Sequence, residues 1–157
     1  MSSVGTTSTQ ARFADLSRSA HSSTEQPLRC KVRGQGVKAH PKYGTSKLEE
    51  KFAHEFLDKL GVEYVYQFEA KEIGRFFDFK IKGGPIIEVQ GSYWHGDKRL
   101  YEEKDLNATQ KRNRTVDKIK LEWALKNGIN VVYVWEKDIN ENPSKVMREL
   151  KKALHLD

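Results

Sequence analysis

The sequence predicts an α/β fold, a single domain that follows a basic N-terminal arm. An amphipathic helical pattern begins at residue 46, and three strand patterns follow it. A second helical pattern, a strand rich in β-branched residues and a final helical pattern complete the chain. This αβββαβα order is typical of a sheet covered by helices. We place the arm at residues 1–44 and the folded domain at residues 45–157.

The first helix is expected between Ser46, a favourable N-cap, and Gly61, a favourable stop. Its apolar stripe consists of Phe52, Ala53, Phe56, Leu57 and Leu60. Glu49 lies one turn before this stripe and on the same side, whereas Glu50 falls on its flank. A carboxylate that faces a core is costly unless it is paired or binds a metal. Glu49 is therefore a candidate site residue, and the alternative is that it serves only the helix dipole.

Residues 62–70, 75–82 and 86–92 are expected to form three strands, and a Gly83-Gly84-Pro85 turn joins the last two as a hairpin. With a loop of these three residues, Asp78 pairs with Gln90 and Phe79 with Val89. One face then carries Asp78, Lys80, Glu88 and Gln90. The opposite face carries Phe77, Phe79, Ile81, Ile87 and Val89 and belongs to a core. A slip of one residue would mix the two sets, which favours this register.

The polar face and the residues after it contain the ligand types of a metal site. Within residues 78–97 the chain places Asp78, Glu88, Gln90, His95 and Asp97. Oxygen ligands on neighbouring strands suit Mg2+, which takes one or two carboxylates and keeps waters and substrate phosphate as its other ligands. His95 is placed to transfer a proton. The alternative is that the carboxylates are solvated surface groups and that His95 only ends a strand.

Three further elements complete the predicted domain. Residues 107–127 are expected to be helical, with Val116, Ile119, Trp123 and Ala124 facing inward. Residues 129–135 alternate little, as expected for an internal strand that is covered on both faces. Asn142-Pro143 begins a last helix that docks through Val146, Met147, Leu150 and Leu154. We expect Trp94, Trp123 and Trp135 to pack in the core or at its rim rather than to stack on bases.

The positive charge is concentrated in the arm. Residues 1–44 hold seven Lys or Arg against two acidic residues, a balance of +5 within a chain total of +6. The first 27 residues are rich in Ser and Thr, which predicts disorder and hence a flexible arm. The basic residues Arg29, Lys31, Arg33, Lys38 and Lys42 are suited to DNA phosphates or a minor groove. The alternative is a solubilising tail.

A second basic cluster lies on the predicted helix and just before it. Its members are Lys98, Arg99, Lys111, Arg112, Arg114 and Lys118, and Lys120 follows them on the helix. They are suited to phosphate contact, although a solvated helix face explains them nearly as well. Cys30 is the lone cysteine, so it can form no internal disulfide and fits a reducing cytoplasm. The sequence has no long apolar run and no secretory h-region, which predicts no membrane partner.

The order of Asp78, the run Gly91-Ser92-Tyr93-Trp94-His95-Gly96-Asp97, a basic helix and the 128–136 strand resembles the very-short-patch-repair (Vsr) endonucleases and their relatives in the PD-(D/E)xK nuclease superfamily. The resemblance covers about residues 46–139. It is closest to the phage homing endonucleases of that fold, named EDxHD for their Glu, Asp, His, Asp pattern, here matched to Glu49, Asp78, His95 and Asp97. The repair enzymes carry a second histidine at the position of Asp97, which favours the homing branch.

This resemblance implies a restriction-endonuclease-like, Vsr-like core and a site-specific endonuclease that hydrolyses double-stranded DNA with Mg2+, for which Mn2+ may substitute. It also implies a cytoplasmic location in a bacterial host, if the protein is phage-encoded. Asp78 would anchor the metal, with Glu49 binding or orienting the metal or its water. His95 would activate water or assist the leaving oxygen, and Asp97 would bind metal or position His95. A Vsr-like mismatch-repair nickase and an inactive DNA-binding protein of the same fold are the alternatives.

The second hairpin strand departs from the superfamily pattern. Where many members carry Glu-x-Lys, this chain has Glu88-Val89-Gln90, so the usual lysine is missing and Gln90 takes its place among the catalytic candidates. In the repair enzymes the position matching Val89 gives a backbone carbonyl to the metal, and the one matching Glu88 is apolar. Asn113 and Asp117 also recur in those relatives, and we interpret them as structural or as supporting the site residues rather than as catalytic. A core this short favours a homo-oligomer.

Overall fold

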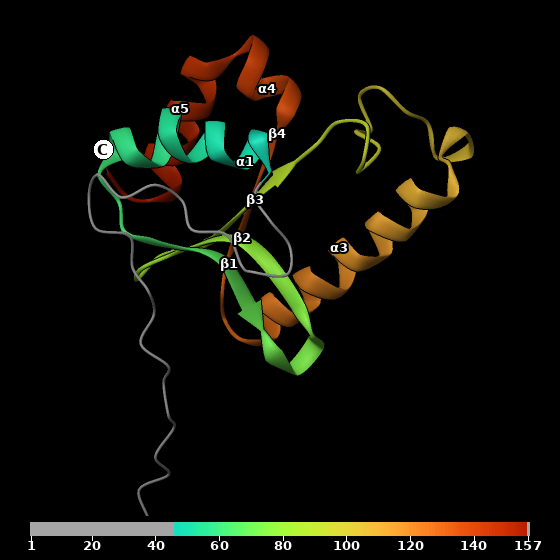
Figure 1. Cartoon of the computed structure of the whole chain (residues 1–157), viewed down its shortest axis with the longest axis horizontal. Coiled ribbons are helices and arrows are strands. Elements are labelled where there is room, and N and C mark those ends of the chain that lie inside the picture. The colour runs from blue at the N-terminus through green and yellow to red at the C-terminus, as the bar shows by residue number, and fades with distance from the viewer. Residues whose placement is uncertain (1–45, 157) are drawn as a thin grey trace, which may run out of the picture.

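Four strands form one mixed sheet in the computed structural model, which describes residues 46–156 (Figure 1). The strands β1 (Tyr64–Ala70), β2 (Arg75–Ile81) and β3 (Ile86–Gln90) are antiparallel, and β4 (Val131–Trp135) runs parallel to β3. The predicted α/β class is confirmed. The arm of residues 1–44 and its basic candidates lie outside the described residues.

The first helical segment runs continuously through α1 (Lys47–Phe52), a π-helical turn η1 (Ala53–Leu57) and α2 (Asp58–Leu60). The Ser46 side chain accepts a hydrogen bond from the Glu49 backbone N–H (3.5 Å), which makes Ser46 the N-cap. Gly61 ends the segment with a left-handed φ of 67°. Both predicted boundaries are confirmed.

The long helix α3 (Ala108–Lys126) connects β3 to β4, and a capping box starts it. Asn107 Oδ1 accepts from the Gln110 backbone N–H (2.9 Å), while Gln110 Oε1 accepts from the Asn107 backbone N–H (3.0 Å). After β4 the chain forms α4 (Glu136–Glu141) and α5 (Pro143–Ala153). Two 3-10 turns, η2 (Lys71–Ile73) and η3 (Glu103–Asp105), lie in connections. The predicted αβββαβα order thus holds with one addition, α4.

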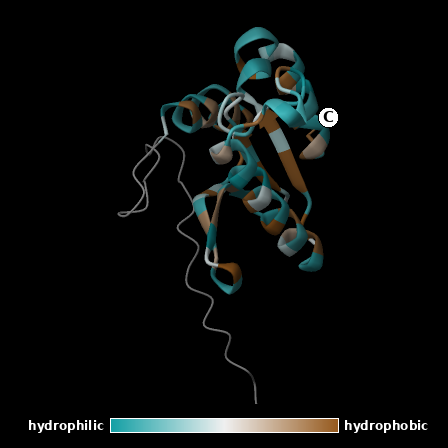
Figure 2. Ribbon diagram, turned by 90° about the vertical axis from the view of Figure 1, so that its right-hand side faces the viewer, coloured by the Kyte–Doolittle hydropathy of each residue, from teal (hydrophilic) through white to brown (hydrophobic). Residues whose placement is uncertain are grey.

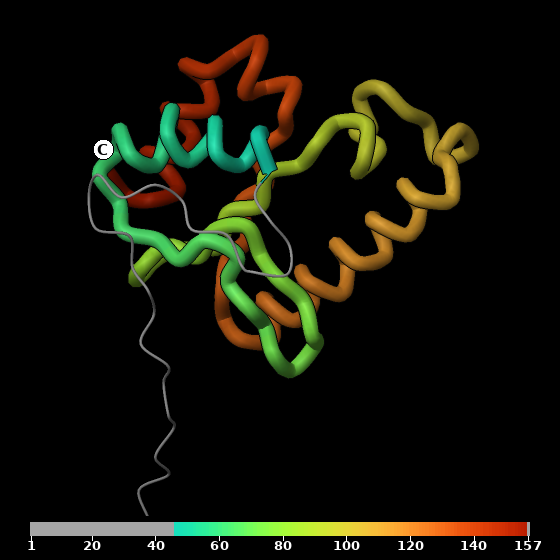
Figure 3. Tube along the Cα trace, viewed as in Figure 1, coloured from blue at the N-terminus to red at the C-terminus, as the bar shows by residue number. Residues whose placement is uncertain are grey.

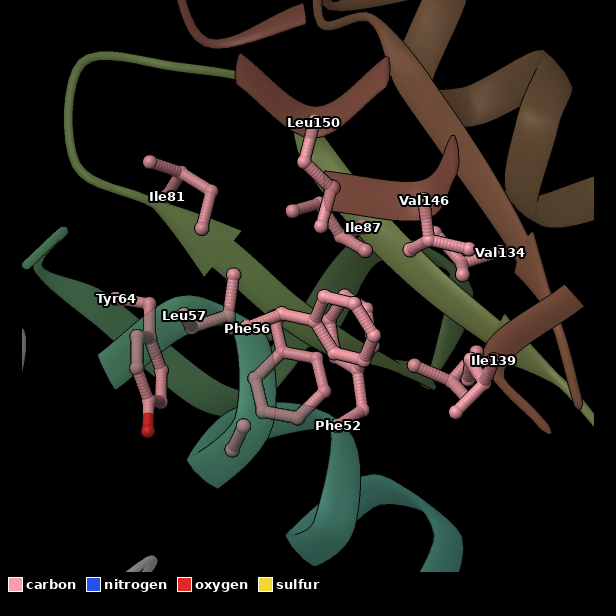
Figure 4. Close-up of a cluster of buried hydrophobic side chains, with 13 residues drawn as sticks. Phe52, Phe56, Leu57, Tyr64, Ile81, Ile87, Val134, Ile139, Val146 and Leu150 are labelled. Carbon is pink, nitrogen blue, oxygen red and sulfur yellow. The ribbon is translucent and has the colours of Figure 1, made fainter. Parts of the chain in front are cut away.

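The larger core lies between the sheet and the layer of α1, α4 and α5 (Figures 1 and 4). It is wholly hydrophobic, and Phe52, Phe79 and Ile87 within it have no exposed surface. The predicted docking residues of α5 contribute to it, with Val146 and Leu150 buried and Met147 and Leu154 packed against them. Figure 2 shows the same division as a hydrophobic sheet beneath hydrophilic outer helix turns.

A smaller core lies between the sheet and α3. Its buried members are Ala70, Phe77, Ile86 and Ala124, and Trp123 packs against them. Figure 3 follows the chain from β3 through a loop to α3, which runs back toward the turn between β1 and β2. Here the Trp123 ring lies 5.5 Å from the Phe77 ring.

The side chains of the β1–β2 hairpin switch from one face of the sheet to the other in the middle of the hairpin. Gln67 has a positive φ of 52°, and the strand register has no Gln67–Asp78 pair between Tyr66↔Phe79 and Phe68↔Phe77. Alternation is therefore broken at Asp78, so Phe79 lies in the larger core and Phe77 in the smaller one. The expectation that both rings share one apolar face is wrong. The consequence is that Asp78 sits where side chains from both helical layers can reach it.

The hairpin register also differs from the predicted one, by two residues. Phe79 pairs with Ile87 rather than Val89, and Lys80 pairs with Ile86. The cause is a tight turn in which the Gly84 N–H donates to the Ile81 carbonyl (3.1 Å), and the Ile81 N–H in turn donates to the Pro85 carbonyl (3.0 Å) just before β3 begins. A shift of two residues leaves each side chain on the same face of the sheet, since side chains alternate along a strand with a period of two. In the observed register Asp78 does not pair with Gln90, so that predicted pairing is wrong.

Two other expectations are wrong. The strand expected to be internal, β4, lies at the edge of the sheet, and β3 is the strand whose residues are all buried. On α3, Ile119 is 40% exposed, and Lys120 is buried instead.

The helices of residues 46–156 are each too short or too polar to cross a membrane.

Candidate active site

Asp78 occupies the crossing point of the β1–β2 hairpin. Its Oδ2 accepts a hydrogen bond from the Val89 backbone N–H (2.7 Å), which ties β2 to β3 where their regular ladder has ended. Burial raises the pKa of Asp78 well above its usual value, and the nearby carboxylates Glu88 and Glu49 raise it further. Asp78, Glu88 and Glu49 therefore form one acidic cluster, although they come from three different elements.

Glu49 reaches this acidic cluster from the first turn of α1. Its Oε2 accepts a hydrogen bond of 2.5 Å from the Tyr66 hydroxyl, which fixes the carboxylate beside the sheet. Burial raises the pKa of Glu49, and the bond from Tyr66 opposes that effect. Its neighbour Glu50 is exposed, so the structure selects Glu49 as the inward carboxylate. Glu49 is also the third residue of the helix, so the proposed dipole interaction is compatible with this position.

Glu88 enters the acidic cluster from β3 and is 3% exposed. Its Oε2 accepts from the ammonium group of Lys120 on α3 (2.7 Å), and both side chains are buried. Burial raises the pKa of Glu88, and Lys120 opposes that rise. Oε1 of Glu88 has no hydrogen-bond partner among the described residues. One oxygen of this carboxylate is thus held and the other is open.

Gln90 ends β3 on the same side as Glu88, because the two are separated by one residue. It is 2% exposed, and its Nε2 also has no partner within residues 46–156. Buried polar groups are almost always hydrogen-bonded, so unpaired ones mark a place for a ligand or water. The structure thus leaves one open acceptor and one open donor along β3.

His95 lies in the loop that follows β3, and α3 supplies its partner. Nδ1 of His95 is 2.7 Å from Oδ2 of Asp117, and both side chains are partly exposed. An ionised carboxylate only accepts hydrogen bonds, so Nδ1 carries the proton in this pair. In the neutral ring, Nε2 then keeps its lone pair. This arrangement orients a general base, as a carboxylate does for histidine in hydrolytic enzymes.

The acidic cluster and the His95–Asp117 pair belong to one electrostatic unit. The carboxylate of Asp117 raises the pKa of Glu88, and both of these groups, together with burial, raise the pKa of Tyr133 on β4 to about 12. Tyr133 is directly opposite Glu88 in the parallel register. A continuous series of acidic side chains therefore runs from Glu49 on one side of the sheet to His95 on the other.

One face of α3 holds the loop that carries His95. Gln110 Nε2 donates to the Tyr93 carbonyl (2.7 Å) and Asn113 Nδ2 to the Trp94 carbonyl (2.8 Å). Arg114 Nη2 donates to the Gly96 carbonyl (2.6 Å), and Asp117 binds His95 itself. Residues separated by three, four and seven positions share a helix face. The first half of α3 therefore fixes four consecutive loop residues, 93–96.

Asp97 does not take the role expected of it. Both of its carboxylate oxygens accept hydrogen bonds from Arg99, at 2.6–3.1 Å, and these bonds lower the pKa of Asp97. Arg99 also forms an ion pair with Asp138 on α4 (2.8 Å). Asp97 thus fastens the loop to α4, and the place expected for it beside His95 is taken by Asp117. The expected role of Asp97 in positioning His95 is corrected accordingly.

The basic candidates fall into two groups. Arg99 and Arg114 form ion pairs within the protein, Arg99 with Asp97 and Arg114 with Glu103. Lys98, Lys111, Arg112 and Lys118 are exposed. Trp94 is 58% exposed beside Tyr93, contrary to the expected packing, whereas Trp123 packs in the smaller core.

Sequence reasoning placed Lys120 in the basic cluster and did not predict its burial against Glu88, and it did not predict that Asp117 binds His95. The signal for Lys120 was present, because a lysine one turn before Trp123 and Ala124 falls on the apolar stripe of its helix, the same argument that selected Glu49. The signal for Asp117 was its spacing of four from Asn113, which places both on the face that meets the loop. Tyr66 gave no signal, since its hydroxyl contact depends on the tertiary fold.

The carboxylates of the acidic cluster are the ligand type that a hard divalent cation prefers. Within residues 46–156, no three His, Cys, Asp or Glu side chains are arranged to hold a metal ion by themselves. Two carboxylates, Asp78 and Glu88, with an open oxygen on Glu88 do fit Mg2+, which needs only one or two carboxylates alongside water and phosphate. Comparison with family models, curated proteins and solved structures found no match to this chain.

Proposed function

We propose that this chain is a divalent-metal-dependent DNA endonuclease of the homing type. The observation that carries the proposal is the unit formed by the acidic cluster at Asp78 and the His95–Asp117 pair. Buried carboxylates with raised pKa values reduce the stability of the fold, and such groups gather at functional sites. A histidine oriented by a carboxylate next to such a cluster supports hydrolysis of a phosphodiester, which needs no covalent intermediate.

The residues divide the chemistry between them. Asp78 and the backbone of Val89 would hold Mg2+, and Glu49 would orient its water. Bound Mg2+ would neutralise charge on the scissile phosphate and lower the pKa of an attacking water. Asp117 keeps the proton on Nδ1 of His95, so Nε2 can accept a proton from that water. Gln90 offers a buried N–H for a phosphate oxygen.

The DNA would lie against the exposed lysines and arginines of α3 and its loop. Lys98, Lys111, Arg112 and Lys118 supply mobile positive charge for phosphates. The basic arm, residues 1–44, would add further phosphate contacts, since it holds most of the net charge. A homo-oligomer would extend the DNA sequence that a domain of this size can read.

The test is cleavage of supercoiled plasmid that carries the DNA flanking the chain's own gene, with Mg2+ or Mn2+ and with chelator. We expect metal-dependent cutting at a defined site, and none from Asp78→Asn, which removes a charge and keeps the shape. Glu50→Gln is the matched control, because Glu50 is an exposed neighbour of a site residue and should be fully active. Full activity of Asp78→Asn would refute the site.

The same assay separates the alternatives. A mismatch-repair nickase would open plasmid or oligonucleotide duplexes only at a mismatch and on one strand. An inactive DNA-binding protein would retain the duplex in a mobility-shift assay without cutting it under any metal. Dependence on Zn2+ rather than Mg2+ or Mn2+ would contradict an oxygen-only ligand set.

A further inference from the structure

The buried Lys120–Glu88 pair is asymmetric. Lys120 Nζ binds only Oε2 of Glu88, at 2.7 Å, and stands 4.9 Å above the Phe77 ring. Oε1 of the same carboxylate is buried and has no partner within residues 46–156. A pair evolved only for stability would satisfy both oxygens, because a bare buried carboxylate oxygen costs free energy that one ion pair does not restore.

The open oxygen belongs to the acidic cluster rather than to an isolated spot. Oδ2 of Asp78 accepts a hydrogen bond from the backbone N–H of Val89 (2.7 Å), the residue that follows Glu88 on β3. Nε2 of Gln90, buried and unpaired, lies on the same side of β3. An open acceptor next to a second carboxylate fits a cation, and the open donor fits a water or phosphate oxygen bound to that cation.

We propose that Glu88 is a bridging carboxylate that binds the divalent cation through Oε1 while Lys120 holds Oε2. This inference rests on the proposed function and adds a ligand to it. It also departs from the resemblance, in which the position matching Glu88 is apolar and contributes nothing to the metal. The site would then contain two charged protein ligands, Asp78 and Glu88.

Lys120 is a positioning residue in this arrangement. Its ammonium group has no lone pair, so it cannot bind a metal. It fixes the rotamer of Glu88 so that one oxygen is left for the cation, and it compensates part of the cluster's negative charge before the cation arrives. Because Lys120 and Asp117 lie one turn apart on α3, this helix orients both the metal ligand and His95.

The experiment is calorimetric titration of the full chain with Mn2+ in the absence of DNA, so that no cleavage is needed for the readout. The variants are Glu88→Gln, Lys120→Met, the double variant and Asp78→Asn. Glu63→Gln with Lys82→Met is the matched control, because Lys82 and Glu63 form an ion pair of the same type on the surface (2.6 Å). Thermal unfolding of every variant verifies that it is folded.

We expect Glu88→Gln and the double variant to bind Mn2+ at least about ten-fold more weakly, the loss typical even of groups that only support a ligand. The double variant replaces a buried pair by neutral groups of similar size and should unfold at or above the wild-type temperature. It therefore tests the ligand role even if Lys120→Met alone does not fold. The surface double variant should bind Mn2+ as the wild type does.

A double variant with wild-type Mn2+ affinity would overturn the bridging role, as would a wild-type chain that binds no Mn2+ at millimolar concentration. Either result leaves the plasmid assay to decide the proposed function by itself. If Asp78→Asn loses Mn2+ and Glu88→Gln keeps it, the endonuclease proposal stands and the bridging proposal fails. If Glu88→Gln loses Mn2+ but the wild type cuts no DNA, the reverse holds.

Discussion

The two sides of the sheet are built for different purposes. The side covered by α1, α4 and α5 encloses the larger hydrophobic core, in which five side chains, Phe52, Phe79 and Ile87 among them, have no exposed surface. The side covered by α3 has a smaller core and admits a buried lysine, a buried glutamate and two unpaired polar atoms. Apart from Glu49, which reaches the acidic cluster from α1, the first side contributes stability, and the second gives up some stability for chemistry.

The larger core can be tested by truncation. Phe79→Ala should destabilise the protein by about 3–5 kcal/mol, since it removes a fully buried ring that contacts Phe52, Tyr64 and Tyr66. Denaturant unfolding measures the loss. Leu125→Ala is the control, because Leu125 is 60% exposed on α3 and should change stability by no more than about 0.5 kcal/mol. A small loss at Phe79 would mean that the two sides do not differ in this way.

Substitutions on the side covered by α3 should lower activity rather than stability. His95→Ala should reduce turnover by about 100-fold or more, equivalent to about 2.7 kcal/mol of transition-state stabilisation, while the melting temperature changes little. Asp117→Asn should follow it, because the asparagine no longer fixes the proton on Nδ1. Single-turnover cleavage measures both, with the exposed His54→Ala as control. Lost stability with unchanged turnover would assign His95 to packing.

Removing a charge from the acidic cluster should raise stability. A carboxyl group with a raised folded-state pKa favours folding below its ordinary pKa, and that contribution is lost as the pH rises through the folded value. At neutral pH the raised pKa of Asp78 therefore disfavours the folded state, so Asp78→Asn should stabilise it by on the order of 1 kcal/mol. The gain should shrink toward pH 4. Thermal unfolding from pH 4 to 8 without metal measures it, and a loss of stability at pH 7 would contradict the sign.

Deleting residues 1–44 should affect stability least, because the predicted domain begins after them. Its expected effect is on DNA affinity. If the arm makes three to five phosphate contacts, its loss should flatten the slope of log affinity against log salt by roughly three to four units. Affinity is measured against salt on cognate and scrambled duplexes. An unchanged slope would identify a passive tail, and a loss on the cognate duplex alone would show sequence reading.

Much of the fold was predictable because its signals are local. Ser46, Gly61 and Asn142-Pro143 set helix ends through caps and a fixed proline φ, and these act over a few residues. The errors arose where distant parts of the chain decide. Strand composition in residues 129–135 cannot tell an edge from a centre, since that depends on which strands pair. The side change at Gln67 depends on a residue that adopts positive φ without being glycine.

In the candidate site, too, the residues predicted from local patterns were found, and those that depend on tertiary packing were not. Asp78, Glu49 and His95 were selected from their positions in local patterns, and the structure brings them into one electrostatic unit. Asp97 was selected because it matches the last position of the family pattern, and in the structure its carboxylate binds Arg99. Asp117 reaches His95 from 22 residues away, because α3 packs against the loop. Sequence proximity predicts neighbours within a strand or a helix but not within a loop.

Gly96, whose carbonyl accepts a hydrogen bond from Arg114, constrains the backbone of the loop that carries His95. It has a φ of 58°, and a Cβ at this position would lie 2.6 Å from Cδ2 of the buried Leu106. Any side chain would therefore meet both backbone strain and a clash one residue after His95. A side chain at this position would have to displace Leu106 or shift the backbone next to His95, so Gly96→Ala should disturb the placement of the histidine.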